Sequence, residues 1–313
     1  MSTIKVDTIT NGDDTFYIYA NGDWYITVAS PPPVALGDRG VFGGGEAAWP
    51  TNEVNVIDYI DITSTGNATD FGDLTVSRRY ISSCSDGARG VFAGGNDGSN
   101  TSNVIDYVTI SSAGNATDFG NLTVARIGLA ACSNTSRGLF GGGANTIDYI
   151  TIATTGDATD FGDLLSSLTY ISSCSSSTRG LWAGGSGDTN VIQYVTIATT
   201  ANAQDFGDLT TGRAYAAACS NKVRGLFAGG YLVDVIDYVT IATTGNATDF
   251  GNLSVAHFAK GAAANVTRGV FAGGKTSTQS NVIDYVTIST PGNATDFGDL
   301  TVARVSLAGC SGN

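Results

Sequence analysis

The sequence has 313 residues, with 15 Lys and Arg against 28 Asp and Glu, and its formal net charge is −13. This acidity argues against nucleic acid or an anionic membrane surface as partner, because both are bound through an excess of Lys and Arg. A single His argues against a multi-His metal site and against a mechanism that needs two imidazoles. No apolar run approaches the roughly 18–20 residues of a membrane span, and the first seven residues do not look like a signal peptide. We therefore expect a soluble, all-β protein without a cofactor or membrane insertion.

The first 30 residues predict a small β-meander. Its strands are expected at residues 4–9, 16–19 and 24–28, separated by Asn-Gly pairs that favour tight hairpins. Such a small sheet is not stable alone in water, so we expect it to pack on a partner or on its own copies. This segment is predicted to serve attachment or homo-oligomerisation, and residues 31–38, which begin with three prolines, to form a stiff linker. The aromatic attachment residues would be Phe16, Tyr17, Tyr19, Trp24 and Tyr25.

Residues 39–313 contain a repeat of six copies. An Arg-Gly pair, two apolar residues and a glycine pair begin each copy, and the copies are spaced 42–50 residues apart. Each copy then has a Tyr in an alternating apolar segment and a Phe 12 residues after that Tyr. The repeated arginines are Arg39, Arg89, Arg137, Arg179, Arg224 and Arg268; the tyrosines are Tyr59, Tyr107, Tyr149, Tyr194, Tyr238 and Tyr285; the phenylalanines are Phe71, Phe119, Phe161, Phe206, Phe250 and Phe297.

Four short strands per copy predict the blades of a six-bladed β-propeller. The first copy lacks a first strand, whereas the last copy is followed by residues 301–310, which match the first-strand segment 123–132. We therefore predict that the C-terminal strand completes the first blade, because a closed ring leaves no open sheet edge at this seam.

The repeated side chains are interpreted as structural. The Phe and Tyr residues would fill the spaces between blades, the glycine pairs would adopt positive φ, and the cysteines would be small buried thiols. Ten of the eleven arginines occupy repeat positions, which favours bracing between blades by carboxylates or carbonyls. Leu168 and His257 replace Arg before two first strands, so His257 is expected to be a surface or bracing residue. Acidic pairs such as Asp70 and Asp73 lack the spacing of a calcium loop, and no metal site is predicted.

The loops between second and third strands differ most among the copies. They are residues 46–55, 96–103, 144–145, 186–190, 231–234 and 275–281. Equivalent loops of a propeller emerge on one face, so we expect them to gather there and to bind a polar ligand such as a glycan or a protein surface. Tolerated drift in exposed loops is the alternative. The candidate ligand-binding residues are Trp49, Asn52, Glu53, Asn96, Asp97, Asp188, Tyr231 and Lys275.

The repeat resembles the kelch repeat over residues 39–313, through its glycine pair, its Tyr, its aromatic residue in the fourth strand and its Arg. Phe stands where kelch units usually carry Trp. The resemblance implies a six-bladed propeller closed by its C-terminal strand. Galactose oxidase, another kelch-like propeller, would need paired His ligands that this sequence does not offer, and a sialidase-like site of three arginines would need an asymmetry that near-identical blades do not provide.

The first nine residues resemble the start of structural and tail-fibre proteins of tailed bacteriophages, notably those that infect cyanobacteria. This resemblance implies a non-enzymatic virion component on the particle surface, a tail fibre or decoration protein, that docks on other virion proteins through its N-terminus. The propeller face would then bind a host glycan or surface protein. A free bacterial lectin or protein-interaction module is the alternative, followed by a hydrolase of surface polysaccharide.

Overall fold

The structure is a computed structural model that describes residues 37–48, 52–258 and 260–312. Within these residues, 24 β-strands form six four-stranded sheets, and all neighbouring strands in each sheet are antiparallel. The N-terminal meander, its five aromatic attachment residues and Trp49 lie outside the described residues, so their roles stay predictions.

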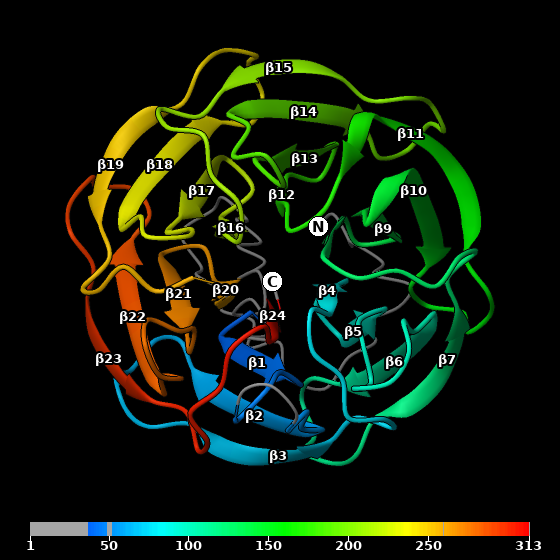
Figure 1. The fold of residues 1–313 in the computed structure, drawn as a ribbon, viewed down its shortest axis with the longest axis vertical. Helices are drawn as coiled ribbons and strands as arrows, with labels where there is room; N and C mark the ends of the chain where they lie inside the picture. The colour runs from blue at the N-terminus through cyan, green and yellow to red at the C-terminus, as the bar shows by residue number, and fades with distance from the viewer. Residues whose placement is uncertain (1–36, 49–51, 259, 313) are drawn as a thin grey trace, which may run out of the picture. The chain divides into compact units, whose positions relative to one another are not determined.

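The six sheets surround a common centre, each with its first strand innermost and its last strand outermost (Figure 1). This arrangement confirms the predicted six-bladed β-propeller. Blade 1 consists of β24 (Ala308–Ser311), β1 (Arg39–Gly43), β2 (Val56–Asp61) and β3 (Thr69–Asp73). Blade 2 consists of β4 (Ser82–Ser85), β5 (Arg89–Ala93), β6 (Val104–Thr109) and β7 (Thr117–Asn121), and blade 3 of β8 (Leu129–Ser133), β9 (Arg137–Gly142), β10 (Ala144–Thr151) and β11 (Thr159–Leu168).

The other three blades repeat this plan. Blade 4 consists of β12 (Ser172–Ser175), β13 (Arg179–Ala183), β14 (Val191–Thr196) and β15 (Gln204–Asp208). Blade 5 consists of β16 (Ala217–Ser220), β17 (Arg224–Ala228), β18 (Val235–Thr240) and β19 (Thr248–Asn252). Blade 6 consists of β20 (Gly261–Ala264), β21 (Arg268–Ala272), β22 (Val282–Thr287) and β23 (Thr295–Asp299).

The C-terminal strand closes the ring as predicted. Strand β24 pairs with β1 in antiparallel register, with Val41 opposite Cys310 and Gly43 opposite Ala308. The first blade is therefore built from both ends of the repeat region, and unfolding of either end opens the ring.

The hydrophobic core is divided among the six seams between blades. Each seam has its own cluster of buried apolar residues, supplied by two neighbouring blades. At the closing seam, Phe297 and Val270 of blade 6 lie in one cluster with Phe42, Ile60 and Ile62 of blade 1. The repeated Phe residues are buried in these clusters and the repeated Tyr residues pack against them, which confirms that both fill the spaces between blades.

The repeated arginines that open each second strand brace neighbouring blades. In blade 1, the Arg39 guanidinium lies 4.5 Å from the centroid of the Tyr59 ring, and Nη1 donates to the carbonyl of Ile110 in the next blade at 3.0 Å. Tyr59 in turn meets Phe71 edge to face. The same arrangement occurs in all six blades, so the predicted arginine–carbonyl bracing is confirmed.

A second set of basic residues, each in the connector that enters a blade, forms buried ion pairs with the Asp of that blade's third strand. These pairs are Arg304–Asp58, Arg78–Asp106, Arg126–Asp148, Arg213–Asp237 and Lys260–Asp284. In blade 6, His257 occupies the sequence position of the arginine, but Lys260 supplies the cation. His257 is itself buried, at 7% exposure, so the prediction of a surface position is wrong.

The cysteines explain why glycine follows five of the six repeated arginines. All five cysteines are buried and free, as predicted. A methyl group on Gly180 of blade 4 would lie 2.5 Å from Sγ of Cys132 in blade 3, and Gly138 faces Cys84 in the same way at 2.7 Å. Glycine therefore lets the inner strand of one blade pack closely on the second strand of the next.

Candidate functional site

One face of the propeller carries two kinds of connection, and we call it the loop face. It contains the loops from second to third strands and the connectors that run from the outermost strand of one blade to the innermost strand of the next. Backbone hydrogen bonds join the two kinds. Arg79 and Asn96 exchange N–H···O bonds of 3.0 and 2.9 Å, and Phe258 and Lys275 exchange bonds of 3.2 and 3.1 Å. The predicted residues Asn96 and Lys275 are thus fixed beside the connectors.

The next residue of each connector lies at the axis of the propeller, and these residues form what we call the axis ring. Its described members are Tyr80, Gly128, Tyr170, Tyr215 and Ser306, with φ of 55°, 64°, 58°, 62° and 61°. Successive members are joined by backbone hydrogen bonds: Tyr80 N–H donates to Ser306, Gly128 to Tyr80, Tyr170 to Gly128 and Tyr215 to Tyr170, at 2.6–3.3 Å. Non-glycine residues seldom adopt this left-handed conformation, and here the ring of hydrogen bonds maintains it.

Five aromatic side chains meet at this axis, and we call them the aromatic platform: Tyr80, Tyr170, Tyr215, Tyr231 and Phe258. Tyr170 and Tyr215 stack with their ring centroids 4.1 Å apart, and Tyr80 meets them at 5.4 and 6.5 Å. Phe258 connects Tyr215 to Tyr231, at 5.8 and 5.4 Å. Burial and the neighbouring Tyr170 raise the pKa of Tyr80 and of Tyr215, so these hydroxyls stay neutral and can donate hydrogen bonds.

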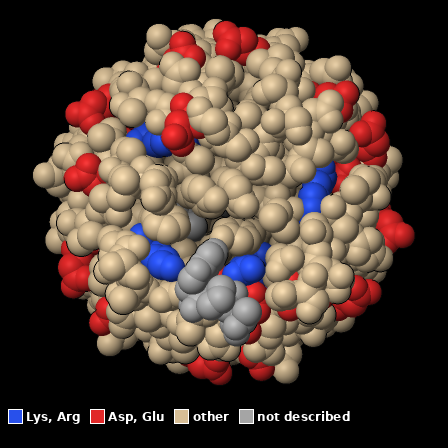
Figure 2. Space-filling view, in the orientation of Figure 1, with Lys and Arg blue, Asp and Glu red and all other residues tan. Residues whose placement is uncertain are grey.

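A charged cluster adjoins the platform. Arg79 Nη1 donates to Oε2 of the fully buried Glu46 at 2.7 Å, and Arg79 Nε lies 3.3 Å from Oε1 of Glu53. The same guanidinium lies 5.5 Å from the centroid of the Tyr80 ring. The two carboxylates thus hold Arg79 beside Tyr80 and more than neutralise its charge. On the face shown in Figure 2, acidic residues lie mainly toward the outer edge and the few basic residues nearer the centre.

The remaining predicted residues lie in the exposed loops. Asn52 is exposed, and Oδ1 of Asp97 accepts hydrogen bonds from the backbone of Ser99 and Asn100 at 2.9 and 2.6 Å. These bonds lower the pKa of Asp97, so its carboxylate serves first to fix its own turn. Asp188 is exposed and has a φ of 50°. The structure therefore brings Glu53, Asn96, Tyr231 and Lys275 close to the connectors, and the backbone of Asp188 close to Gly212 of the connector that enters blade 5, and leaves Asn52 and Asp97 in exposed loops.

The sequence analysis did not identify Tyr80, Tyr170, Tyr215 and Phe258 as candidate residues. The aromatic residues singled out within residues 39–313 were those that recur in all six copies and those in the variable loops, Trp49 and Tyr231. The useful signal is an aromatic residue in the connector, at the second position after the arginine in Arg78–Tyr80 and Arg213–Tyr215, and directly after His257 in blade 6. Only the fold shows that these positions converge on one axis.

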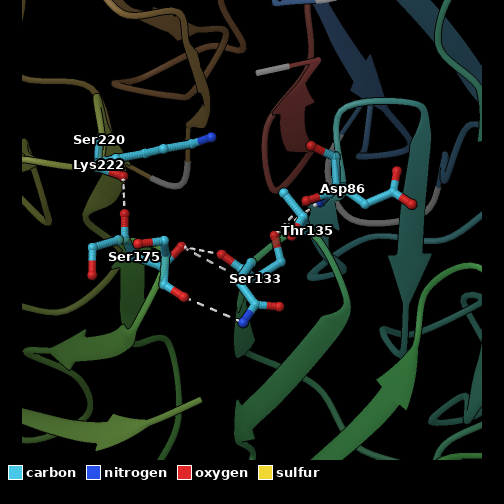
Figure 3. Close-up of a pocket in the computed structure, with 10 residues that line it drawn as sticks. Asp86, Ser133, Thr135, Ser175, Ser220 and Lys222 are labelled. Carbon is cyan, nitrogen blue, oxygen red and sulfur yellow. Dashed lines mark hydrogen bonds between the residues drawn. The ribbon is translucent and has the colours of Figure 1, made fainter. Parts of the chain in front are cut away.

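The opposite face has a contrasting, repeated structure. Five serines at the ends of the innermost strands each donate from Oγ to the backbone carbonyl of the equivalent residue in the preceding blade: Ser85, Ser133, Ser175, Ser220 and Ser311. Four of them, Ser85, Ser133, Ser175 and Ser220, line a pocket with Asp86, Thr135 and Lys222, and Figure 3 labels the last three of these serines. The sixth position is Ala264, which has no hydroxyl group. We call this row the serine seam.

The serine seam and two positions of the loop face differ in how far the blades match one another. The serine seam has the same residue in five of six blades. On the loop face, the residue after the glycine pair is different in every blade: Glu46, Asn96, Ala144, Ser186, Tyr231 and Lys275. The connector residue before the axis ring is also different in every blade: Val305, Arg79, Ile127, Thr169, Ala214 and Phe258.

No protein-family model matches this chain, and no curated protein matches it in sequence. The resemblance to the kelch repeat therefore rests only on the repeated residues of the sequence. The structure shows the class of fold, which is a six-bladed β-propeller. Across residues 37–48, 52–258 and 260–312, no helix has the length and apolar character to cross a membrane. In the same part of the chain, no three His, Cys, Asp or Glu side chains come together as ligands for a metal ion.

Proposed function

We propose that this chain is a non-enzymatic binding protein whose loop face recognises a partner. The observation that carries the proposal is the loss of symmetry at these two loop-face positions, together with the unequal lengths of the loops from second to third strands. The loop-face residues stand at equivalent places with fixed backbones, as the paired bonds of Asn96 and Lys275 illustrate. Sequence drift in flexible loops does not account for different side chains at positions whose backbone is fixed. Recognition of one asymmetric partner, in contrast, requires different side chains in different blades.

The chemistry of the loop face also supports binding rather than catalysis. The carboxylates of Glu46 and Glu53 are held by Arg79, which leaves them poorly placed to act as an acid and base pair. The only histidine of the sequence, His257, is buried beside the Lys260–Asp284 pair. Aromatic residues at the centre with polar residues around them are typical of recognition surfaces.

As the biological setting we propose a virion appendage, a tail fibre or decoration protein. The support is the resemblance of the first nine residues to structural proteins of tailed bacteriophages, together with the predicted N-terminal attachment segment. The kelch-like repeat is compatible with this setting, because propellers often serve as recognition modules. Mass spectrometry of purified phage particles from the source sample should find this polypeptide. Its absence there would favour a free bacterial lectin.

The face can be tested by blocking it. Because the five natural cysteines are buried, a single exposed cysteine can be labelled selectively with a polymer-bearing maleimide. Ser99→Cys places the label on the loop face, and Thr135→Cys places it on the opposite face. We expect the first conjugate to lose binding to cyanobacterial cells and the second to retain it. Equal binding by both conjugates, or no cell binding by the unlabelled protein, would contradict the proposal.

A further inference from the structure

The aromatic platform combines apolar ring faces with hydroxyl groups on a rigid backbone. Three of its five members are tyrosines of the axis ring, where positive φ and ring-to-ring hydrogen bonds fix the main chain. Tyr80, Tyr170 and Tyr215 are only half-buried, and Tyr231 is 55% exposed. Such side chains offer contact area at low conformational cost, since few rotatable bonds are ordered on binding.

Short polar side chains stand next to the platform. Asn96 is paired with the connector beside Tyr80, and the N–H of Ser186 donates at 2.8 Å to the carbonyl of Thr169, the residue before Tyr170. Asn96 is partly exposed and Ser186 is exposed. Amide and hydroxyl groups of this kind both donate and accept hydrogen bonds, which suits a ligand rich in hydroxyl groups.

The charges around the platform disfavour an anionic ligand. Glu46, Glu53, Asp97 and Asp188 outnumber Arg79 and Lys275 among the loop-face residues discussed above. Arg79 is already paired with two of these carboxylates. With a net charge of −13 on the whole chain, a polyanion would be repelled rather than attracted.

The apolar surface outside the platform is scattered rather than continuous. Val76, Val124 and Val255 in connectors and Leu165 in β11 are 40–59% exposed, and each precedes a different blade. Leu232, at 77% exposure, follows Tyr231 in the loop of blade 5. Single exposed aliphatic residues are normal on protein surfaces and do not mark a large protein interface. The concentrated feature is the small aromatic centre with its polar neighbours.

We propose that the aromatic platform binds a neutral carbohydrate chain at the propeller axis. Sugar rings would stack their C–H faces on the tyrosine rings, and their hydroxyl groups would bond to the tyrosine hydroxyls, Asn96 and Ser186. This inference rests on the proposed function, because it assigns a ligand class to the same loop face.

Variants for the test can be taken from the chain itself. Gly128 occupies the axis-ring position in blade 3, with a φ of 64°. The double variant Tyr170→Gly, Tyr215→Gly therefore places glycine at two further axis-ring positions of the same backbone conformation. Lys222→Gly is the matched control, because Lys222 is an exposed residue with a φ of 71° on the opposite face. Circular dichroism would establish that all variants keep the fold.

The probe is whole cyanobacterial cells, untreated, oxidised with mild periodate or digested with proteinase K. We expect periodate to abolish binding, protease to leave it intact, and the neutral fraction of released polysaccharide to compete where the acidic fraction does not. The double tyrosine variant should bind the cells roughly tenfold more weakly than the native chain, or more weakly still. The Lys222→Gly variant should bind them with the same affinity as the native chain.

Loss of binding after protease alone would identify a protein partner and overturn the carbohydrate inference. Competition by the acidic fraction only, or full binding by the double tyrosine variant, would also overturn it. In each of these cases the loop-face label still blocks binding, so the proposed function survives. If the Ser99→Cys conjugate binds cells normally, the proposed function itself fails.

Discussion

Blade 4 lacks the buried ion pair that the other five blades contain, and this difference provides a built-in double-mutant cycle. Leu168 and Gln193 stand where blade 5 has Arg213 and Asp237. In blade 4, Oε1 of Gln193 accepts a hydrogen bond from the N–H of Leu165 at 2.7 Å. In blade 5, Oδ2 of Asp237 accepts one from the N–H of Thr210 at 3.1 Å. The neutral pair therefore keeps the connector contact while it removes both charges.

The magnitude follows from what each substitution leaves behind. Arg213→Leu leaves the fully buried Asp237 carboxylate without its cation, and Asp237→Gln leaves a buried guanidinium whose pKa is already lowered by burial. Each single change should cost about 3–5 kcal/mol in the free energy of unfolding. The double variant loses the paired charges together, the 2.9 Å bond from Arg213 Nη1 to the carbonyl of Val235 and the 2.6 Å bond from Thr210 Oγ1 to Oδ1 of Asp237, and the two lost bonds cost about 1–2 kcal/mol.

Urea unfolding followed by circular dichroism would measure all four proteins. We expect each single variant to be less stable than the double variant by about 1–4 kcal/mol, with strong coupling between the two positions. Simple addition of the two single effects would show that the charges stabilise the blade independently. That result would refute the interpretation of Leu168 and Gln193 as a compensating pair.

Three further predictions concern the seams and the connector of blade 6. Ala264→Ser should add the missing hydroxyl of the serine seam and raise stability by about 1 kcal/mol, whereas Ser220→Ala should lower it by a similar amount in thermal melts. Gly180→Ala should destabilise the propeller because its methyl group would overlap Cys132, and Cys132→Ala should recover part of the loss; no recovery would place the strain elsewhere. Burial, with a smaller contribution from a neighbouring lysine, lowers the pKa of His257 from 6.5 to about 4. The unfolded chain therefore binds the proton first, so stability should fall from pH 6.5 toward pH 4, and by less in His257→Gln.

The fold could be predicted because every blade repeats the same physical solution. The fixed interval between Tyr59 and Phe71, and between their counterparts, reflects an edge-to-face contact that recurs in all six blades. The closing strand could be predicted because residues 301–310 match an inner strand that blade 1 lacks. The six copies could thus be compared with one another, as homologous sequences are compared in an alignment.

The candidate site could be predicted only in part. Three candidates from the variable loops, Asn96, Tyr231 and Lys275, lie beside the connectors, and their role in binding a ligand stays a prediction. The connectors were treated as structural, so the convergence of Tyr80, Tyr170 and Tyr215 was missed. Their meeting depends on the radius of the closed ring and on positive φ, neither of which leaves a periodic signal in the sequence. The ion pair of Asp284 with Lys260 in place of His257 was missed for a similar reason. Which side chain lies beside Asp284 depends on the path of the connector in three dimensions and not on its position in the repeat.

The two faces differ in what holds their backbones together, and this difference explains where the blades can vary. At the serine seam the hydrogen bonds between blades come from side chains, so replacing Ser133 removes a bond. At the axis ring the bonds between blades run from backbone to backbone, as from Tyr170 to Gly128, and survive a change of side chain. Tyrosine, glycine and serine therefore occupy the same place in different blades without loss of the ring. The loop face can change its recognition residues while the propeller stays closed, which is the property that a binding surface needs.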